Sequence, residues 1–305
     1  MNTVPTTPIL YCFDDGFTEC SLVSAYQALK LSPTNTEVYL VHNKLTPLNF
    51  QRVNNFTSKF SSRVHSREFI EELPKVKGTH FTNFALARLF EIMRFNDKVL
   101  YLDGDTLPRK PLNGLLSMDI GGKAIGAAIC PTHVSWWYKS LSSSRPGHKR
   151  NSSIVSLRLS QLKLSTIEHY VNSGVMLADP SAIRRLNLEQ GFIDVETAAQ
   201  CRWADQDHIN MICSNSIQLI DSTYNSIWGN LALRNSVIPR ALQASQHEAM
   251  TDPVIVHFAG KQKPWRHDKQ RIGMKLRQLT TRRVERKFTQ EWLQARDQLY
   301  ASLGE

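Results

Sequence analysis

The sequence lacks the features that mark membrane-spanning, secreted and zinc-finger proteins. No apolar run among its 305 residues approaches the roughly 20 residues that a helix needs to cross a bilayer. The start of the chain has neither a basic segment nor an apolar one of the kind found in signal peptides, so we expect a cytoplasmic protein. The five cysteines are scattered without a Cys-x-x-Cys pair, which favours reduced thiols over disulfides or a zinc site.

Acidic residues are scarce at one end of the chain. The formal net charge is +10, from 37 Lys and Arg against 27 Asp and Glu. Between Lys261 and Glu305 there are twelve basic and five acidic residues, so this segment alone carries +7. The basic character therefore belongs to the tail, which needs an explanation of its own.

Short apolar runs alternate with amphipathic stretches over the first two-thirds of the chain, as in βαβ units. Six runs are expected to be strands: residues 8–13, 37–42, 98–102, 123–129, 173–178 and 253–258. Helical spacing of apolar residues predicts helices over 21–31 and 83–93, and an acidic first turn predicts another over 205–213. The stretch 142–153 is either a domain linker or a mobile loop; because strand signals resume soon after it, we favour a loop within one domain.

Two aspartates, Asp103 and Asp105, follow the apolar run 98–102. Ligands of open α/β sheets bind beyond the carboxyl ends of strands, and Gly104 leaves the backbone free to turn. Two like charges here resist desolvation unless a positive group lies between them. A solvated turn with Asp caps would explain the pair without a ligand. The alternative is a Mg²⁺ or Mn²⁺ site completed by a diphosphate, because carboxylates are hard ligands.

Four motifs together resemble the retaining glycosyltransferases of family 8, which include bacterial lipopolysaccharide galactosyl- and glucosyltransferases and the glycogenins. The motifs are VLYLDGD (99–105), YVNSGVMLADPSAIRRL (170–186), ADQDHIN (204–210) and VIVHFAGKQKPW (254–265). They occur in the family's order, which is more specific than any one motif; Asp205 and Asp207 alone would suit an ordinary helix start. The resemblance implies a GT-A fold, with a Rossmann-like mixed sheet between helices. It also implies a UDP-sugar donor.

The resemblance assigns roles to individual residues. Asp103 and Asp105 would bind the metal with His257 as third ligand, which favours Mn²⁺ over Mg²⁺ because imidazole nitrogen is a softer ligand. The expected catalytic residues are Gln206 beneath the reacting carbon, Asp205 on the sugar hydroxyls and Asn172 on the sugar and phosphate. The other expected donor contacts are Asp14 and Asp15 for uracil and ribose, Thr82 and Arg88 for the nucleotide and sugar, Gly104 in the metal motif, Ser173 beside the sugar, and Gly260 and Lys263 for the diphosphate.

One position departs from the family's pattern. Cys130 stands where the family usually has an aspartate that contacts the sugar or the acceptor. A thiol cannot accept strong hydrogen bonds as a carboxylate does, so the family's donor preference is not carried over. Trp136 and Trp137 would either stack on an acceptor sugar or pack as ordinary aromatic side chains.

The resemblance implies the transfer of a hexose, with galactose and glucose as the family's usual donors, to a glycan or lipid-linked saccharide. The metal and Lys263 would stabilise the leaving diphosphate. Gln206 is a poor nucleophile, which favours front-face attack by the acceptor over a covalent enzyme intermediate. The alternative function is a sugar-nucleotide nucleotidyltransferase. It would need a Gly-rich phosphate loop after the first strand, and YCFDDGFTEC (11–20) has a single glycine. A non-catalytic carbohydrate-binding module would not need a metal.

We expect a catalytic domain over 1–265 and a basic, helical extension over 266–305. Helical spacing places Phe288, Trp292 and Leu299 close to one face, with Lys and Arg elsewhere. Such a helix would hold the enzyme on an anionic surface, the inner face of the cell membrane, where its acceptor lies. In the alternative, the helix packs on the catalytic domain and its charges are only solvated. No nucleic-acid partner is expected, because no nucleic-acid-binding motif is present.

Overall fold

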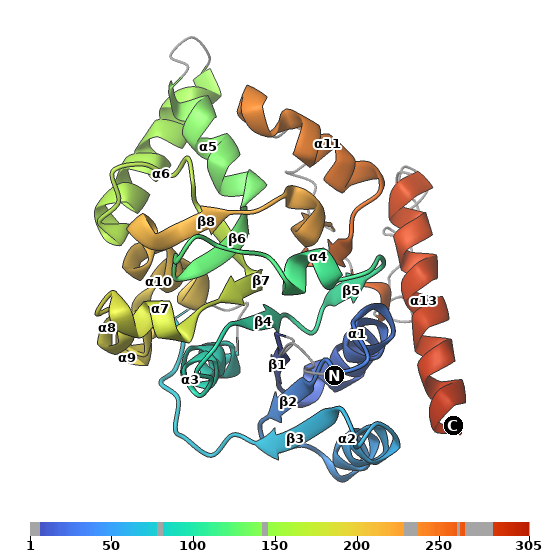
Figure 1. Ribbon diagram of the computed structural model, residues 1–305. Helices are drawn as coiled ribbons and strands as arrows, with labels where there is room; N and C mark the ends of the chain where they lie inside the picture. Colours follow the sequence, from blue (N-terminus) through green and yellow to red (C-terminus); the bar gives the residue numbers. More distant parts are fainter. Residues whose placement is uncertain are drawn as a thin grey trace.

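The centre of the molecule is a seven-stranded mixed sheet (Figure 1). The computed structural model describes residues 7–77, 82–141, 146–228, 237–260, 263–265 and 283–304. The strands lie in the order β3-β2-β1-β4-β7-β6-β8, and their bounds are β1 (Ile9–Phe13), β2 (Val38–His42), β3 (Val64–Glu68), β4 (Val99–Leu102), β6 (Ile125–Ile129), β7 (Val171–Ala178) and β8 (Ile217–Leu219). β7 is antiparallel to both of its neighbours, while the other pairs are parallel. The predicted mixed α/β sheet is confirmed.

A second, three-stranded sheet lies beside the end of β4. It consists of β5 (Thr106–Pro108), β10 (Ile255–His257) and β9 (Ser226–Ile227), with β10 in the middle. In the antiparallel pairing of β10 with β5, His257 faces Thr106. The backbone N–H of Phe258 donates to the carbonyl of Asp105 at 2.9 Å. This small sheet therefore brings His257 to the turn that follows β4.

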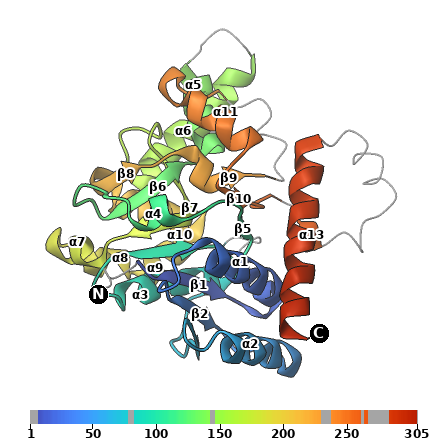
Figure 2. The same ribbon diagram turned by 45° about the vertical axis from the view of Figure 1, so that its right-hand side comes forward.

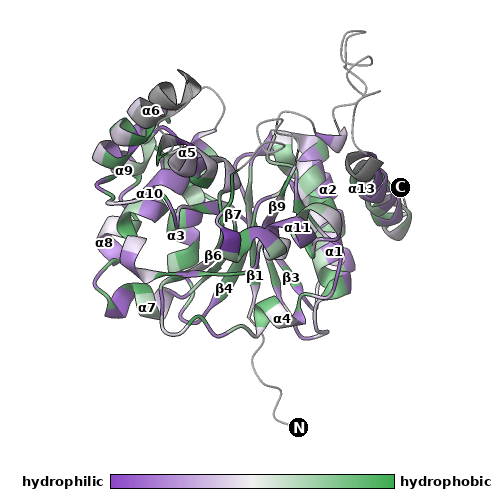
Figure 3. Ribbon diagram, turned by 90° about the horizontal axis from the view of Figure 1, so that it is seen from above, coloured by the Kyte–Doolittle hydropathy of each residue, from purple (hydrophilic) through white to green (hydrophobic). Residues whose placement is uncertain are grey.

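Helices cover both faces of the large sheet (Figure 3). Their bounds are α1 (Thr18–Leu31), α2 (Pro47–Lys59), α3 (Ala87–Met93), α4 (Asn113–Leu116), α5 (Pro131–Leu141), α6 (Pro146–Leu162), α7 (Pro180–Arg185), α8 (Glu189–Phe192), α9 (Val195–Gln200), α10 (Ala204–Ile212), α11 (Gln243–Thr251) and α13 (Arg283–Leu303). Alternation along β1 sends Ile9 and Tyr11 to the core shared with α1, α2 and α13, and Leu10 to the core shared with α3 and α10. Because both faces are covered, the inner strands β1, β4 and β6 are continuous apolar runs, whereas the edge strands β3 and β8 carry polar side chains.

The expectation of a loop over 142–153 was wrong for most of that stretch. α5 ends at Leu141 and α6 begins at Pro146, while residues 142–145 lie outside the described residues. Proline is well suited to a helix start, since its missing N–H would have no partner there. One face of α6 is buried through Val155, Arg158 and Leu162. The many Ser and Arg residues of α6 obscure the helical spacing of its apolar residues in the sequence.

The C-terminal helix α13 packs against α1 and crosses it (Figures 1 and 2). Phe288, Trp292 and Leu299 are buried in the same core as α1. The helix is tied to the catalytic domain by an ion pair and two hydrogen bonds: Arg109 Nε to Glu291 Oε2 (2.5 Å), Tyr300 Oη to Glu19 Oε1 (2.5 Å) and Lys30 Nζ to Gln298 Oε1 (2.8 Å).

These contacts correct one expectation about the tail. The apolar face expected to lie on a membrane was wrongly assigned, because its side chains fill the protein core, as the packing alternative required. Residues 266–282, which carry six Lys and Arg and one Asp, lie outside the described residues, and the boundary at 265/266 stays a prediction. Among the described residues, no helix is long and apolar enough to cross a membrane.

Candidate active site

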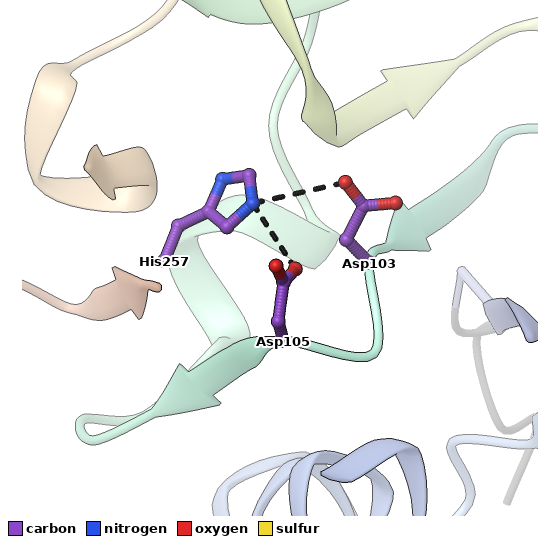
Figure 4. A group of neighbouring side chains, drawn as sticks. All are labelled: Asp103, Asp105 and His257. Carbon is purple, nitrogen blue, oxygen red and sulfur yellow. Dashed lines mark ion pairs between the residues drawn. The ribbon is translucent and has the colours of Figure 1, made fainter. Parts of the chain in front are cut away.

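Three side chains expected to bind a metal converge beyond the end of β4. Asp103 and Asp105 come from the turn after that strand, and His257 comes from β10 (Figure 4). Nε2 of His257 lies 3.1 Å from Oδ1 of Asp105 and 3.7 Å from Oδ2 of Asp103. One ligand atom from each residue lies within 4.8 Å of the other two. Two carboxylates and an imidazole suit a divalent cation such as Mn²⁺.

The backbone around this cluster leaves room that a side chain would fill. A Cβ at Gly174, on β7, would lie 2.2 Å from Cε1 of His257 and 2.7 Å from Oδ2 of Asp103. The residues present therefore fit a bound metal ion. Gly104 is needed for a different reason than its expected freedom to turn, because its φ is not in the left-handed region. A Cβ there would lie 2.0 Å from Oγ of Ser21 on α1.

The positive partners that the two aspartates require come from the chain itself. Nζ of Lys263 lies 2.6 Å from Oδ2 of Asp105, and both side chains are nine-tenths buried. Nη2 of Arg88, on α3, lies 2.8 Å from Oδ1 of Asp103. Burial alone would raise the pKa of Asp105, but Lys263 and His257 outweigh it and hold this pKa well below its usual range. Asp105 is thus a carboxylate at any physiological pH.

Arg88 also connects the metal cluster to α10. Its Nη1 lies 3.2 Å from Oδ2 of Asp205, and the hydroxyl of Ser173 donates to that same oxygen at 2.9 Å. Burial raises the pKa of Asp205 to about 6, with Arg88 opposing the shift and Asp103 adding to it. Arg88 therefore lies between two carboxylates rather than on the surface.

Gln206 is held on both sides of its carboxamide. Oε1 accepts from Nδ2 of Asn172 at 2.6 Å, and Nε2 donates to the hydroxyl of Tyr170 at 3.1 Å. The same hydroxyl donates to Oδ1 of Asp207 at 2.5 Å, and Arg158 pairs with both oxygens of Asp207. Tyr170, Asp207 and Arg158 were not predicted as site residues. Asp207 could have been found from the ADQDHIN motif, but nothing in the sequence pointed to Arg158 as its partner.

Other residues expected to contact the donor are spread over both sheets. Asp14 follows β1, which is the parallel neighbour of β4. Oδ1 of Asp15 accepts from the backbone N–H of Thr46 at 2.7 Å and from Nδ2 of Asn49 at 2.8 Å, which lowers the pKa of Asp15. Thr82 lines a cavity of about 330 Å³ together with Asn43, Phe69, Glu71, Leu73, Asn83 and Phe84. The N–H of Gly260 donates to the carbonyl of Trp228 at 2.9 Å.

Cys130 is buried in the same cluster as Tyr170, the residue that accepts a hydrogen bond from Gln206. Its Sγ lies 3.1 Å from Nδ1 of His133, and burial raises the pKa of Cys130 to about 11, so the thiol is neutral. The ring of His133 stacks on Tyr170 with centroids 4.3 Å apart. Trp136 and Trp137 pack against this cluster while remaining partly exposed. Packing is what these tryptophans show; stacking on an acceptor stays a prediction.

The family model described as glycosyl transferase family 8 matches residues 8–269. The chain belongs to this family. The glycosyltransferase predicted from the four motifs is therefore confirmed at the level of the family.

Curated relatives are similar over part of their length. The lipopolysaccharide 1,3-galactosyltransferase of Salmonella typhimurium (strain LT2) is 26% identical over 202 residues, which is 65% of this chain and 53% of that protein. The lipopolysaccharide glucosyltransferase WaaO of Escherichia coli (strain K12) is 24% identical over 212 residues, again 65% and 53%. The chain thus spans about half the length of these relatives.

Solved structures share the fold. The galactosyltransferase LgtC, in a complex with donor and acceptor sugar analogues, matches with a TM-score of 0.67 at 19% identity, covering 96% of both chains. The bifunctional glycosyltransferase WbbM matches with a TM-score of 0.69 at 22% identity, covering 88% of this chain and 49% of that one. The GT-A fold predicted from the sequence is confirmed.

Proposed function

We propose that the chain is a retaining hexosyltransferase that moves galactose or glucose from a UDP-sugar to a saccharide of the lipopolysaccharide type, with Mn²⁺ at Asp103, Asp105 and His257. The observation that carries the proposal is this metal-ligand cluster with Lys263 beside it, in a chain that matches a glycosyltransferase family over most of its length. The curated relatives, named as galactosyl- and glucosyltransferases of lipopolysaccharide, support the choice of hexose and acceptor.

The charged residues suit a diphosphate leaving group. A metal held by Asp103, Asp105 and His257 would supply a Lewis acid for the phosphate oxygens. Lys263 places a buried positive charge next to Asp105, where negative charge develops as the diphosphate leaves. The low pKa of Asp105 keeps it in the form that a metal binds.

The sugar side of the site lacks a free nucleophile among the described residues that flank Gln206. Asp205 is engaged by Arg88 and Ser173, and Asp207 is fully buried against Arg158. An amide is a poor nucleophile beside a carboxylate. We therefore favour front-face attack by the acceptor hydroxyl, with the departing phosphate assisting its deprotonation. A sugar trapped covalently on any side chain during turnover would exclude this route.

The basic tail supports a second, separate proposal about location. Because α13 uses its apolar face for packing, attraction to an anionic surface would depend on charge alone. Residues 266–282 carry six Lys and Arg, and each basic residue near an anionic leaflet contributes about 1 kcal/mol. We propose that this segment brings the enzyme to a membrane surface that holds a lipid-linked acceptor.

Metal-dependent donor hydrolysis tests the proposed function. UDP-galactose and UDP-glucose are each incubated with the full chain and Mn²⁺, and thermal unfolding is followed with UDP, Mn²⁺ or both. We expect stabilisation by the pair beyond that given by either alone. Asp105→Asn should weaken Mn²⁺ binding by at least about a hundredfold, the upper end of the loss caused by removing an outer-shell partner. Near-normal hydrolysis by this variant would refute the metal assignment.

A further inference from the structure

A continuous line of hydrogen bonds runs from Asp207 on α10 to His257 on β10. All of its members except the partly exposed Gln206 are buried. The contacts, each written from donor to acceptor, are Tyr170 Oη to Asp207 Oδ1 (2.5 Å), Gln206 Nε2 to Tyr170 Oη (3.1 Å), Asn172 Nδ2 to Gln206 Oε1 (2.6 Å), Asn225 Nδ2 to Asn172 Oδ1 (2.8 Å) and His257 Nδ1 to Asn225 Oδ1 (2.9 Å).

The first link fixes the direction of the line. The Asp207 carboxylate is paired with Arg158 and also accepts from the backbone N–H of Trp203 at 2.9 Å. An ionised carboxylate can only accept, so the hydroxyl of Tyr170 must donate its single proton to it. The phenol oxygen can then only accept from Gln206. The NH₂ of Gln206 therefore faces Tyr170, and its Oε1 faces away.

The donor and acceptor in each later hydrogen bond follow from the one before it. Asn172 must donate its NH₂ to Gln206, which turns its Oδ1 toward Asn225. The backbone N–H of Gly174 donates to the same Oδ1 at 3.1 Å. Because a backbone N–H cannot be reversed, it fixes Asn172 independently in the same orientation. Asn225 must then donate to Asn172, and its Oδ1 is left to accept from His257.

We propose that this line fixes the protonation pattern of His257, with a proton held on Nδ1. Nε2, the nitrogen that faces Asp103 and Asp105, is then the atom available to a metal. A metal-binding histidine generally needs such an acceptor on its other nitrogen, which sets the tautomer and the ring orientation. The inference rests on the proposed metal site and makes Asn225 a positioning residue for it. It also means that the same hydrogen bonds orient Gln206 and His257.

The tautomer can be observed directly on the unmutated chain. Nitrogen-15 NMR of the imidazole rings is recorded without metal or nucleotide at about pH 8.5, well above the usual pKa of histidine. The His257 signals are assigned by their loss in His257→Gln. We expect a proton bonded to Nδ1. A spectrum in which Nδ1 carries no proton would overturn the inference.

Two matched variants of Asn225 test its effect on metal binding. Asn225→Leu removes the acceptor opposite Nδ1, and Asn225→Asp keeps one. Calorimetry with Mn²⁺ alone should show a loss of affinity of about 10- to 100-fold for the leucine variant and a much smaller loss for the aspartate variant. Equal losses in the two variants, with circular dichroism showing both folded, would contradict the positioning role. If the leucine variant does not fold, the NMR measurement on the unmutated chain decides.

The readouts separate this inference from the proposed function. Nδ1 protonation and Mn²⁺ affinity are measured without any sugar nucleotide. A chain with the expected tautomer that hydrolyses no UDP-hexose would count against the function alone. A chain that hydrolyses the donor but carries no proton on Nδ1 of His257 would count against this inference alone.

Discussion

At the scale of single residues, the buried carboxyl of Asp205 predicts an unusual pH dependence of stability. Its pKa is about 6 in the folded chain, against 3.8 for an ordinary aspartate. Between these two values the folded state binds the proton more tightly than the unfolded state does. The free energy of unfolding therefore falls as the pH rises through this window. A shift of roughly two pKa units corresponds to about 3 kcal/mol.

Asp205→Asn removes that titration. The stability of this variant relative to the unmutated chain should increase by about 2 to 3 kcal/mol between about pH 4 and about pH 6.5. Urea unfolding across this range measures the difference, with Asp97→Asn at an exposed position as the control. A difference that stays constant with pH would show that Asp205 does not titrate as described.

Gly174 predicts a steric effect on the metal site. In Gly174→Ala, the new methyl group would overlap His257 and Asp103, and displacing such neighbours typically costs about 1 to 3 kcal/mol. Mn²⁺ affinity should fall with stability, since two of the three ligands must move. Gly191→Ala is the matched control, because its Cβ would meet only the side chain of Ile212 at 3.3 Å. Unchanged Mn²⁺ binding in Gly174→Ala would show that the space beside Gly174 is not needed for the metal site.

At the scale of elements, α13 is expected to stabilise the whole fold. Trp292 is fully buried, and truncating such a side chain costs about 3 to 5 kcal/mol. Its ring also lies 5.2 Å from that of Trp265, two residues after Lys263, so Trp292→Ala should weaken UDP binding as well. Urea unfolding and UDP titration measure the two effects. Gln294→Ala, at an exposed position of the same helix, should change stability by less than about 0.5 kcal/mol.

Comparison of elements shows which signals the sequence contains. The six predicted strands correspond to β1, β2, β4, β6, β7 and β10, and each predicted end lies within two residues of the observed one, because their buried side chains and apolar flanks leave a clear run. β5 and β9 are too short to leave any pattern. α2 was missed because only Val53 and Phe56 of its side chains are buried. Apolar periodicity is a poor guide where a helix buries so little.

The sequence predicted the site residues that belong to local motifs, but not those that are brought together by packing. The spacing of Asp103 and Asp105 is local, and the likeness of the motifs brought in His257 and Lys263. The bridge from Arg88 to both Asp103 and Asp205 depends on packing between α3, β4 and α10, which no local pattern encodes. Arg158 lies in the part of α6 beyond the expected loop 142–153, where no helix was predicted, so its pairing with Asp207 could not be foreseen.

At the scale of the whole molecule, the uneven charge predicts salt-sensitive binding to anionic vesicles. The test variant replaces four basic residues of the tail with glutamine: Lys269, Arg271, Lys275 and Arg277. About 1 kcal/mol for each residue corresponds to roughly a thousandfold weaker partitioning, measured by co-sedimentation at low and moderate salt. This variant leaves every residue of α13 unchanged.

The matched control neutralises four exposed lysines of the catalytic domain: Lys44, Lys59, Lys75 and Lys77. It carries the same net charge as the tail variant. Equal vesicle binding by the two variants would show that overall charge, rather than the tail, governs attraction to the surface.

The contact between α13 and α1 can form only after nearly the whole chain has been synthesised. Tyr300 and Glu19, which are hydrogen-bonded across this contact, are 281 residues apart in the sequence. At about 5 to 20 residues per second, a ribosome needs roughly 15 to 55 seconds to add the chain between them. Throughout that interval the part of α1 that contacts α13 lacks its partner, while the rest of α1 packs on β1, β5 and α2. Nascent chains stalled before α13 emerges should therefore aggregate more readily than the full chain. The enzyme's yield in the cell would depend on how well chaperones cover this part of α1 until α13 has been made.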